Sequence, residues 1–389
     1  MVDSGSRGGR PGQPRLRVLV VIKCLGFGGA ERLLADTVSN GDHEAFDYEV
    51  AYVLASEDGM VPLIEADGTP VHSLGATGNG DLRWMGRFRR LLQDGHFDIV
   101  HFHLPYTASL GRLVVASIPS ATRPAIVYTD HSLWNKMAIV VKALNRTTIG
   151  LDQAMIVVSD AALESLPRSI RGRARVLVHG VDLSQAEALV ARRQDIRAEV
   201  RREFGVADDD VLVVSVANLR PEKGYDVLLD ATRILADRGL PAKVVAVGRG
   251  ELEEEMAARH ARLHLGDRLV FAGQRADVLR ILAGADAFVL ASRQEGLPVV
   301  LMEATSVGLP IVATAVGGVP QVLTDDVDGL VVPPGDPVAL ADALARVIAD
   351  PDLRTRLGAA AKERSAMFDV AEASRTIESI YREVAPVRR

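Results

Sequence analysis

The chain has 389 residues, of which 48% are hydrophobic and 25% are charged, and its formal net charge is −6. This length is comfortable for two domains, and the acidic balance argues against nucleic acid as the main partner. Cys24 is the single cysteine, which excludes a disulfide within the chain and suits a reducing compartment. No apolar run approaches the length of about 18 residues that predicts a membrane-spanning helix.

The first half of the chain predicts an α/β domain. The opening stretch 1–14 is rich in Gly, Pro, Ser and Arg without an apolar middle, so we expect a disordered tail rather than a secretory signal. A strand is then predicted over Leu16–Ile22, followed by a Gly-rich turn and a helix. Unalternating Val, Leu and Ile runs are typical of parallel strands buried on both faces. Further runs of this kind are Ile99–Phe102, Ala125–Tyr128 and Met155–Val158.

The second half repeats this order. A strand is predicted over Val211–Ala217, then a turn over 220–224 and a helix from Tyr225, and later runs are Val244–Val247, Leu269–Phe271, Asp286–Ala291 and Ile311–Ala313. Because helical stretches lie between the strands, each half predicts a doubly wound α/β domain. We expect an N-terminal domain over 15–182, a charged and helix-prone linker over 183–208, a C-terminal domain over 209–365, and a final segment over 366–389. That final segment contains a helix with an apolar stripe.

Two carboxylates stand in unusual surroundings near the end of a predicted strand. Glu295 lies in a Gly-Pro turn, and Glu303 is the only charged residue of an apolar helix that is predicted to start near Pro298 and stop at Gly308. An isolated carboxylate on such a helix is costly to bury without hydrogen-bond donors, and sugar hydroxyls would supply them. The alternative is a Glu on an exposed polar face or one capped by a backbone amide.

Two cations also lie where a helix begins. Arg220 and Lys223 precede the helix from Tyr225, although a helix dipole disfavours cations at its start. An anion between them would explain the arrangement, and a diphosphate is the obvious candidate. The alternative is a surface loop in which Glu222 partly neutralises Lys223. A second anion site is predicted at the next helix start, from the backbone of Gly296, Leu297, Pro298 and Val299.

The glycines after the first strand are weaker evidence. Gly28 and Gly29 would let the backbone approach a phosphate, but an ordinary tight turn has the same composition. A dinucleotide fingerprint needs a third glycine where this chain has Glu31, which disfavours a nicotinamide enzyme.

Histidines collect at predicted strand ends in the first half. His101 and His103 end one strand, and His131 follows another. A lone His is usually structural. No ligand spacing recurs around Asp130 and His131, and no Asp-x-Asp stands at a strand end, so we expect no metal site. Phosphate charge would then be neutralised by Arg220, Lys223 and helix ends.

Five motifs in order resemble family four of the retaining glycosyltransferases, whose GT-B fold has two Rossmann-like domains facing across a cleft. They cover roughly residues 15 to 385. The motifs are 28–31, 179–182, 218–224, the pair Glu295 and Glu303, and 316–320. The resemblance implies a metal-independent hexosyl transfer from a UDP- or GDP-sugar, which is a substrate, so no cofactor is expected. It also implies that the final helix crosses back to the N-terminal domain.

The resemblance assigns roles residue by residue. Glu295 and His131 would address the transferred sugar, Glu303 the ribose, and Arg275 and Ala276 the base through a backbone turn. His103 would lie near the acceptor, and His179 would be structural. The family more often has its arginine two positions earlier, where this chain has Asn218. The phosphate contacts would come from Gly28, Gly29, Arg220, Lys223 and 296–299.

The sequence leaves the acceptor open among a glycolipid, a cell-surface polysaccharide precursor and a small metabolite. Two rival functions are a nucleotide-sugar epimerase of the same fold and a non-catalytic nucleotide-sugar-binding subunit. We expect a cytoplasmic protein, with the inner face of the membrane as an alternative. That alternative arises because residues 83–92 and 134–146 combine basic, aromatic and aliphatic side chains. For both segments we prefer a helix packed on the sheet with its basic side in water.

Overall fold

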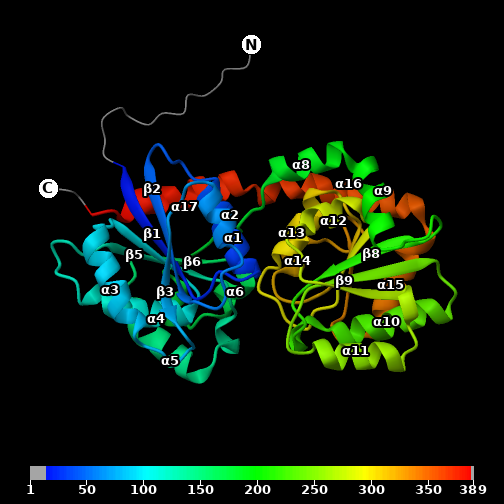
Figure 1. Ribbon diagram of the computed structural model, residues 1–389, viewed down its shortest axis with the longest axis horizontal. Helices are drawn as coiled ribbons and strands as arrows, with labels where there is room; N and C mark the ends of the chain where they lie inside the picture. The colour runs from blue at the N-terminus through cyan, green and yellow to red at the C-terminus, as the bar shows by residue number, and fades with distance from the viewer. Residues whose placement is uncertain (1–14, 387–389) are drawn as a thin grey trace, which may run out of the picture. The chain divides into compact units, whose positions relative to one another are not determined.

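The computed structural model describes residues 15–386, so the predicted tail over 1–14 lies outside the described residues. The chain divides into two compact units. Within the described residues, unit 1 takes 15–158, 163–177 and 371–386, and unit 2 takes 159–162 and 178–370. Each unit is built on one parallel sheet, as Figure 1 shows. The prediction of two doubly wound, Rossmann-like α/β domains is confirmed.

Unit 1 has a seven-stranded sheet with the order β3-β2-β1-β4-β5-β6-β7. Its strands are β1 (Leu16–Ile22), β2 (Phe46–Leu54), β3 (Val71–Ala76), β4 (Ile99–His103), β5 (Ala125–Asp130), β6 (Ala154–Val157) and β7 (Ala174–Val176). Its helices are α1 (Gly29–Ser39), α2 (Val61–Ala66), α3 (Trp84–Gly95), α4 (Pro105–Ala116), α5 (Ile139–Thr148), α7 (Arg168–Arg171) and α17 (Val370–Val384). Helix α6 (Asp160–Ser165) is shared between the two units.

Unit 2 has a six-stranded sheet with the order β10-β9-β8-β11-β12-β13. Its strands are β8 (Val211–Val216), β9 (Ala242–Val247), β10 (Leu269–Gly273), β11 (Ala287–Leu290), β12 (Ile311–Thr314) and β13 (Leu330–Val332). Its helices are α8 (Leu183–Ala191), α9 (Arg193–Glu203), α10 (Tyr225–Asp237), α11 (Glu253–Arg262), α12 (Val278–Gly284), α13 (Val299–Ser306), α14 (Val319–Val322), α15 (Pro337–Ala349) and α16 (Pro351–Arg364).

Both sheets reverse their strand order beside their first strand. In unit 1, Val18 of β1 is paired with Tyr48 of β2 on one side and with Ile99 of β4 on the other. In unit 2, β8 lies between β9 and β11. Parallel strands end at one edge, and ligands of open α/β sheets bind outside that edge where the order reverses. The fold therefore points to the loops after β1 and β4 and after β8 and β11.

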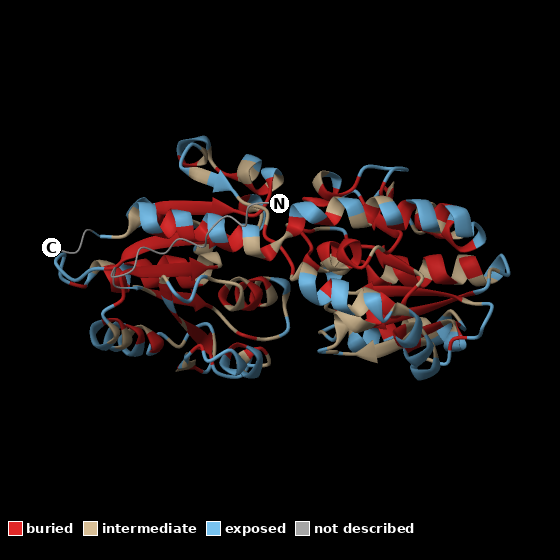
Figure 2. Ribbon diagram, turned by 90° about the horizontal axis from the view of Figure 1, so that it is seen from above, coloured by how far each residue is buried: buried red, intermediate tan, exposed pale blue. Residues whose placement is uncertain are grey.

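The strands are the most buried part of each unit. Figure 2 shows buried residues concentrated in the sheets and exposed residues on the outer sides of the helices. Because helices cover both faces, a strand such as β1 buries its consecutive side chains and needs no polar alternation. No helix within residues 15–386 combines the length and the apolar character needed to cross a bilayer.

The stretch 183–208 and helix α17 each pack into one of the two units, and periodicity alone does not show into which. The stretch 183–208, expected as a linker, forms α8 and α9 in unit 2. Helix α9 buries Ile196 and Val200, and an added Cβ on Gly284 of α12 would lie 2.8 Å from Val200, so the two helices pack closely. Helix α17 buries Ile377 and Tyr381 in the core of unit 1, where they join side chains of β1, β2 and β4.

Candidate functional site

In unit 2 the loops after β8 and β11 form one connected structure. The backbone N–H of Arg293 donates to the carbonyl of Glu222 at 2.8 Å, and its guanidinium donates twice to Asp226, both at 2.6 Å. Gly224 has φ +64°, and a Cβ there would lie 2.1 Å from the carbonyl oxygen of Ala291. Only glycine fits this close approach without strain. The two loops are therefore held against each other at the reversal of strand order.

This connection brings Lys223 and Glu295 together. The Lys223 Nζ lies 2.9 and 2.8 Å from the two carboxylate oxygens of Glu295, and the Ser292 hydroxyl donates to Oε1 at 2.6 Å. The Glu295 side chain is 6% exposed and that of Lys223 is 23% exposed. A buried carboxylate needs such partners, since an unpaired charge away from water is costly. The two charged residues are predicted from the sequence, whereas Ser292 is not.

The turn after a third strand, β12, packs against the backbone of Glu295 and Gly296. Gly317 follows β12 with φ +53°, and a Cβ there would lie 2.1 Å from the Glu295 carbonyl oxygen. The neighbouring Gly318 donates its backbone N–H to the carbonyl of Gly296 at 2.6 Å. The 316–318 turn thus fixes the backbone that leads into α13, and a side chain at either glycine would displace it.

The other predicted residues of unit 2 lie on the segments that lead to and from this pair. Arg220 is exposed at the end of the β8 loop, and Glu303 is half-buried on α13. Helix α13 begins after Pro298 and ends before Gly308, as the sequence predicts. Leu297, Pro298 and Val299 are buried in the turn that precedes and opens the helix, while Gly296 is half-buried.

Arg275 lies farther along the same sheet, after β10. Its guanidinium donates to Asp277 at 2.8 and 2.9 Å and to Glu203 of α9 at 2.6 Å. These carboxylates raise the pKa of Arg275, the largest cause being the hydrogen bonds that it donates to Asp277. The side chain is occupied, so the backbone of Arg275 and the exposed Ala276 is the part of this turn open to a ligand.

In unit 1 the glycine turn after β1 already contains an anion. A Cβ on Gly28 would lie 2.2 Å from the carboxylate of Glu31, which is 8% exposed and accepts a hydrogen bond from the Cys24 thiol at 3.2 Å. Burial, followed by the charge of Glu31, raises the pKa of Cys24, so the thiol stays protonated. A phosphate near Gly28 and Gly29 would share the helix start with this carboxylate.

Two predicted histidines of unit 1 are in direct contact. His103 Nδ1 lies 2.8 Å from His131 Nε2, and the rings stack at 5.1 Å. The chain turns sharply after His103 because Leu104 has φ +68°, an uncommon conformation for a branched residue that often marks functional sites. The resemblance predicts a sugar contact for His131 and a place near the acceptor for His103. In the structure these two residues form one hydrogen-bonded pair.

The ring of His101 packs against this pair, with its centroid 4.4 Å from that of His103. His101 Nδ1 lies 2.6 Å from the Tyr381 hydroxyl on α17, and its Nε2 lies 2.7 Å from the Thr129 hydroxyl. Asp130, next to His131, is fully buried, and burial raises its pKa to about 6 although Ser132 donates to it from both its backbone and its hydroxyl. His131 therefore directly follows a carboxyl group whose pKa is raised by burial.

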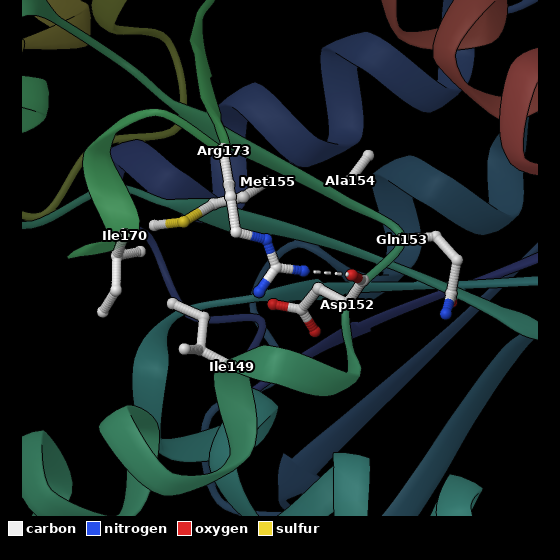
Figure 3. Close-up of a pocket in the computed structure, with 7 residues that line it drawn as sticks. All are labelled: Ile149, Asp152, Gln153, Ala154, Met155, Ile170 and Arg173. Carbon is white, nitrogen blue, oxygen red and sulfur yellow. Dashed lines mark hydrogen bonds between the residues drawn. The ribbon is translucent and has the colours of Figure 1, made fainter.

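A small pocket elsewhere in unit 1 is separate from these residues. Its volume is about 210 Å³, and Figure 3 shows Arg173 donating to the backbone carbonyl of Asp152 at its side. None of the predicted site residues lines it. The lining residues are Ile149, Asp152, Gln153, Ala154, Met155, Ile170 and Arg173.

Two family profiles match the chain. The family described as Glycosyl transferases group 1 matches residues 196–364, and the one described as Glycosyltransferase Family 4 matches residues 27–185. Similar proteins include a D-inositol 3-phosphate glycosyltransferase of Saccharomonospora viridis, which is 29% identical over 75% of this chain and 71% of its own length. An alpha-D-kanosaminyltransferase of Streptomyces kanamyceticus is 28% identical over 80% and 84% of the two chains.

A third relative is a GDP-mannose-dependent alpha-(1-6)-phosphatidylinositol monomannoside mannosyltransferase of Mycolicibacterium smegmatis. It is 30% identical over 71% of this chain and 74% of its own length. Among solved structures, the crystal structure of Anabaena Alr3699/HepE in complex with UDP and glucose superposes on this chain with a TM-score of 0.81 at 21% identity. The match covers 95% of this chain and 100% of the other. At that identity the structural likeness supports the fold.

Proposed function

The chain belongs to the glycosyl transferases of group 1, and we propose that it moves a sugar from a nucleoside diphosphate sugar to an acceptor hydroxyl with retention at the anomeric carbon. It is a glycosyltransferase by family. The observation that carries the finer proposal is the contact of Lys223 with Glu295 at the ligand-binding edge of the unit 2 sheet. One cation and one carboxylate are the charges needed there, the first for a leaving diphosphate and the second for sugar hydroxyls.

The diphosphate is assigned to the cations of the β8 loop. Lys223 offers a point charge and Arg220 a planar fork, and both suit phosphate oxygens. The backbone N–H groups of Gly296, Leu297 and Val299 at the start of α13 add donors. In this proposal the two cations carry the charge neutralisation, and the transfer needs neither a metal ion nor a cofactor.

The sugar, ribose and base fall to the neighbouring groups. Glu295 accepts hydrogen bonds from the hydroxyls of the transferred sugar. The hydrogen-bonded pair of His103 and His131 is the polar group that unit 1 offers to a sugar hydroxyl. Glu303 binds the ribose, because a half-buried carboxylate on an apolar helix gains most from hydroxyl donors. The backbone of Arg275 and Ala276 reads the base. A UDP- or GDP-sugar is the donor class, in line with the UDP complex of the structural neighbour and the GDP-mannose of one relative.

The acceptor is a hydroxyl of a glycolipid, a polysaccharide precursor or a small metabolite. These classes match the names of the relatives, which include an inositol 3-phosphate enzyme and a phosphatidylinositol mannoside enzyme. Nucleotide release that depends on an added acceptor would support transfer. A new free sugar nucleotide without an acceptor would point to an epimerase, and nucleotide-sugar binding without any turnover would point to a binding subunit.

The donor site can be tested by calorimetry with UDP and GDP. Lys223→Ala and Arg220→Ala should each weaken binding by about 1.5–3 kcal/mol, the usual loss for a charge-assisted hydrogen bond. Arg238→Ala is the matched control, because Arg238 is also a unit 2 cation and pairs with Asp342 at 2.7 Å. Unchanged affinity in both test variants would remove the phosphate site from the β8 loop.

A further inference from the structure

Helix α5 of unit 1 presents apolar side chains to the outside. Ile139 is 84% exposed and Val140 is 70% exposed, which makes them the most exposed large hydrophobic residues in the described part of the chain. Leu144, one turn further, is 36% exposed. We call this region the α5 surface; it consists of Lys136, Ile139, Val140, Lys142, Leu144 and Arg146.

The inward side of α5 is polar instead. Asn145 and Thr148 are its buried residues, and both accept hydrogen bonds from the fully buried Arg112, at 2.6 and 3.3 Å. Arg112 also makes a two-fold ion pair with Asp152 at 2.6 and 2.7 Å. A buried guanidinium must have such partners. Arg112 therefore determines which side of α5 faces the unit, and the aliphatic side chains are left outside, the reverse of an ordinary surface helix.

Helix α3 shows the ordinary arrangement for comparison. It buries Trp84, Phe88 and Leu92 on the sheet, and Arg89 and Arg90 lie on its exposed side. The expectation of a helix packed on the sheet with its basic side in water thus describes residues 83–92. For residues 134–146 it describes the exposed Lys136 and Arg146, but the exposed side of α5 also carries aliphatic side chains.

The charge of this region is uniformly positive. Residues 131–151 contain Lys136, Lys142 and Arg146 and no Asp or Glu, although the chain as a whole has a net charge of −6. We propose that the α5 surface docks on an anionic lipid bilayer. The aliphatic side chains enter the boundary between headgroups and acyl chains, and the basic side chains extend to the lipid phosphates. This inference does not rest on the proposed function.

A bilayer fits this surface better than a second copy of the chain does. In a symmetric dimer the same patch meets itself, so three cations would face three cations around the apolar centre. An anionic membrane instead offers an extended negative surface, and each basic residue near it contributes about a fivefold gain in partitioning.

The test uses the full chain and large vesicles of phosphatidylcholine, with and without phosphatidylglycerol. Flotation should recover the protein with the anionic vesicles, and recovery should fall as salt is raised, because salt screens the charge contribution. The double variant Ile139→Ser, Val140→Ser should lower the partition coefficient at least about tenfold. The double variant Lys136→Ala, Lys142→Ala should lower the partition coefficient by about 25-fold, or about fivefold for each cation removed.

A matched control replaces two exposed aliphatic residues of unit 2, Val338→Ser and Met367→Ser, which are 52% and 61% exposed. This variant should bind vesicles like the wild type, and all variants should keep the circular dichroism and the urea midpoint of the wild type. Equal recovery with neutral and anionic vesicles, or no loss in the α5 variants, would overturn the proposal. So would light scattering that shows a wild-type dimer and a monomeric Ile139→Ser, Val140→Ser variant.

Discussion

Replacing Glu295 by glutamine removes a charge but little else. The side chain keeps its shape and an acceptor oxygen for the Ser292 hydroxyl, while the carboxylate that lies 2.8 and 2.9 Å from the Lys223 Nζ is lost. A diphosphate that binds Lys223 must compete with this carboxylate. We therefore expect Glu295→Gln to tighten the binding of UDP or GDP, and Lys223→Ala to weaken it.

The size of the gain follows from how buried the pair is. The side chains are 6% and 23% exposed, so their attraction exceeds that of a fully exposed pair. Exposed pairs contribute up to about 1 kcal/mol and charge-assisted hydrogen bonds about 1.5–3 kcal/mol. Recovering roughly 1 kcal/mol in Glu295→Gln corresponds to about fivefold tighter nucleotide binding. Turnover should fall at the same time, because the contact to the displaced sugar is lost in the transition state.

Calorimetry at one fixed salt concentration measures these affinities in the wild type, the two single variants and the double variant. In Lys223→Ala the second change has no ammonium to release, so Glu295→Gln should have little further effect. Glu303→Gln serves as the comparison, since a ribose contact predicts weaker binding of the free nucleotide. The reasoning is refuted if Glu295→Gln loses affinity as strongly as Lys223→Ala, or if Glu303→Gln leaves affinity unchanged.

Three further outcomes can be checked. Ser292→Ala should lower kcat about tenfold with little change in nucleotide affinity, because its hydroxyl holds only Glu295; Ser365→Ala, whose hydroxyl bonds the Lys362 carbonyl at 2.6 Å, is the control. Transfer activity should survive excess EDTA, and a full loss restored by Mn²⁺ would contradict the metal-independent proposal. Burial raises the pKa of Asp130 from 3.8 to about 6, so the folded unit loses stability as pH rises between these values. Asp130→Asn should therefore raise the free energy of unfolding by up to about 3 kcal/mol at pH 7 and change it little at pH 4. Urea unfolding followed by tryptophan fluorescence reports it, because Trp84 and Trp134 are the two tryptophans of the chain and both lie in unit 1; an equal effect at both pH values would count against the buried charge.

The central strands were predictable because their burial leaves a direct trace in the sequence. The run Leu16–Ile22 is β1 itself, and β8 and β12 differ from their predicted bounds by a residue. The strands that went unnoticed lie toward the edges of the sheets. In β2, Asp47 and Glu49 interrupt the apolar run, and β7 and β13 are only three residues long. A strand with one solvated side, or one of only three residues, has no long unbroken apolar run by which the sequence could reveal it.

The candidate site was predictable as residue types but not as contacts. Strand ends and helix starts indicate Lys223, Glu295 and His131, because parallel topology collects such positions at one edge. Nothing in the sequence gives the ion pair, whose members are 72 positions apart, or the hydrogen bond between His103 and His131. Ser292 looks like any loop serine. The orientation of α5 depends on Arg112, which lies on another helix, so periodicity within α5 alone leads to the wrong side.

The place of α17 has a consequence for the order in which the chain folds during synthesis. Ile377 and Ile380 complete the apolar core of unit 1, and Tyr381 contacts His101, yet these residues are synthesised after the whole of unit 2. Unit 2 is continuous from 178 to 370 and has its whole sheet available earlier. Unit 1, whose first strand precedes unit 2 in the sequence, is therefore completed after unit 2. A nascent chain stopped before residue 371 should contain a folded unit 2 and a unit 1 that still exposes part of its core.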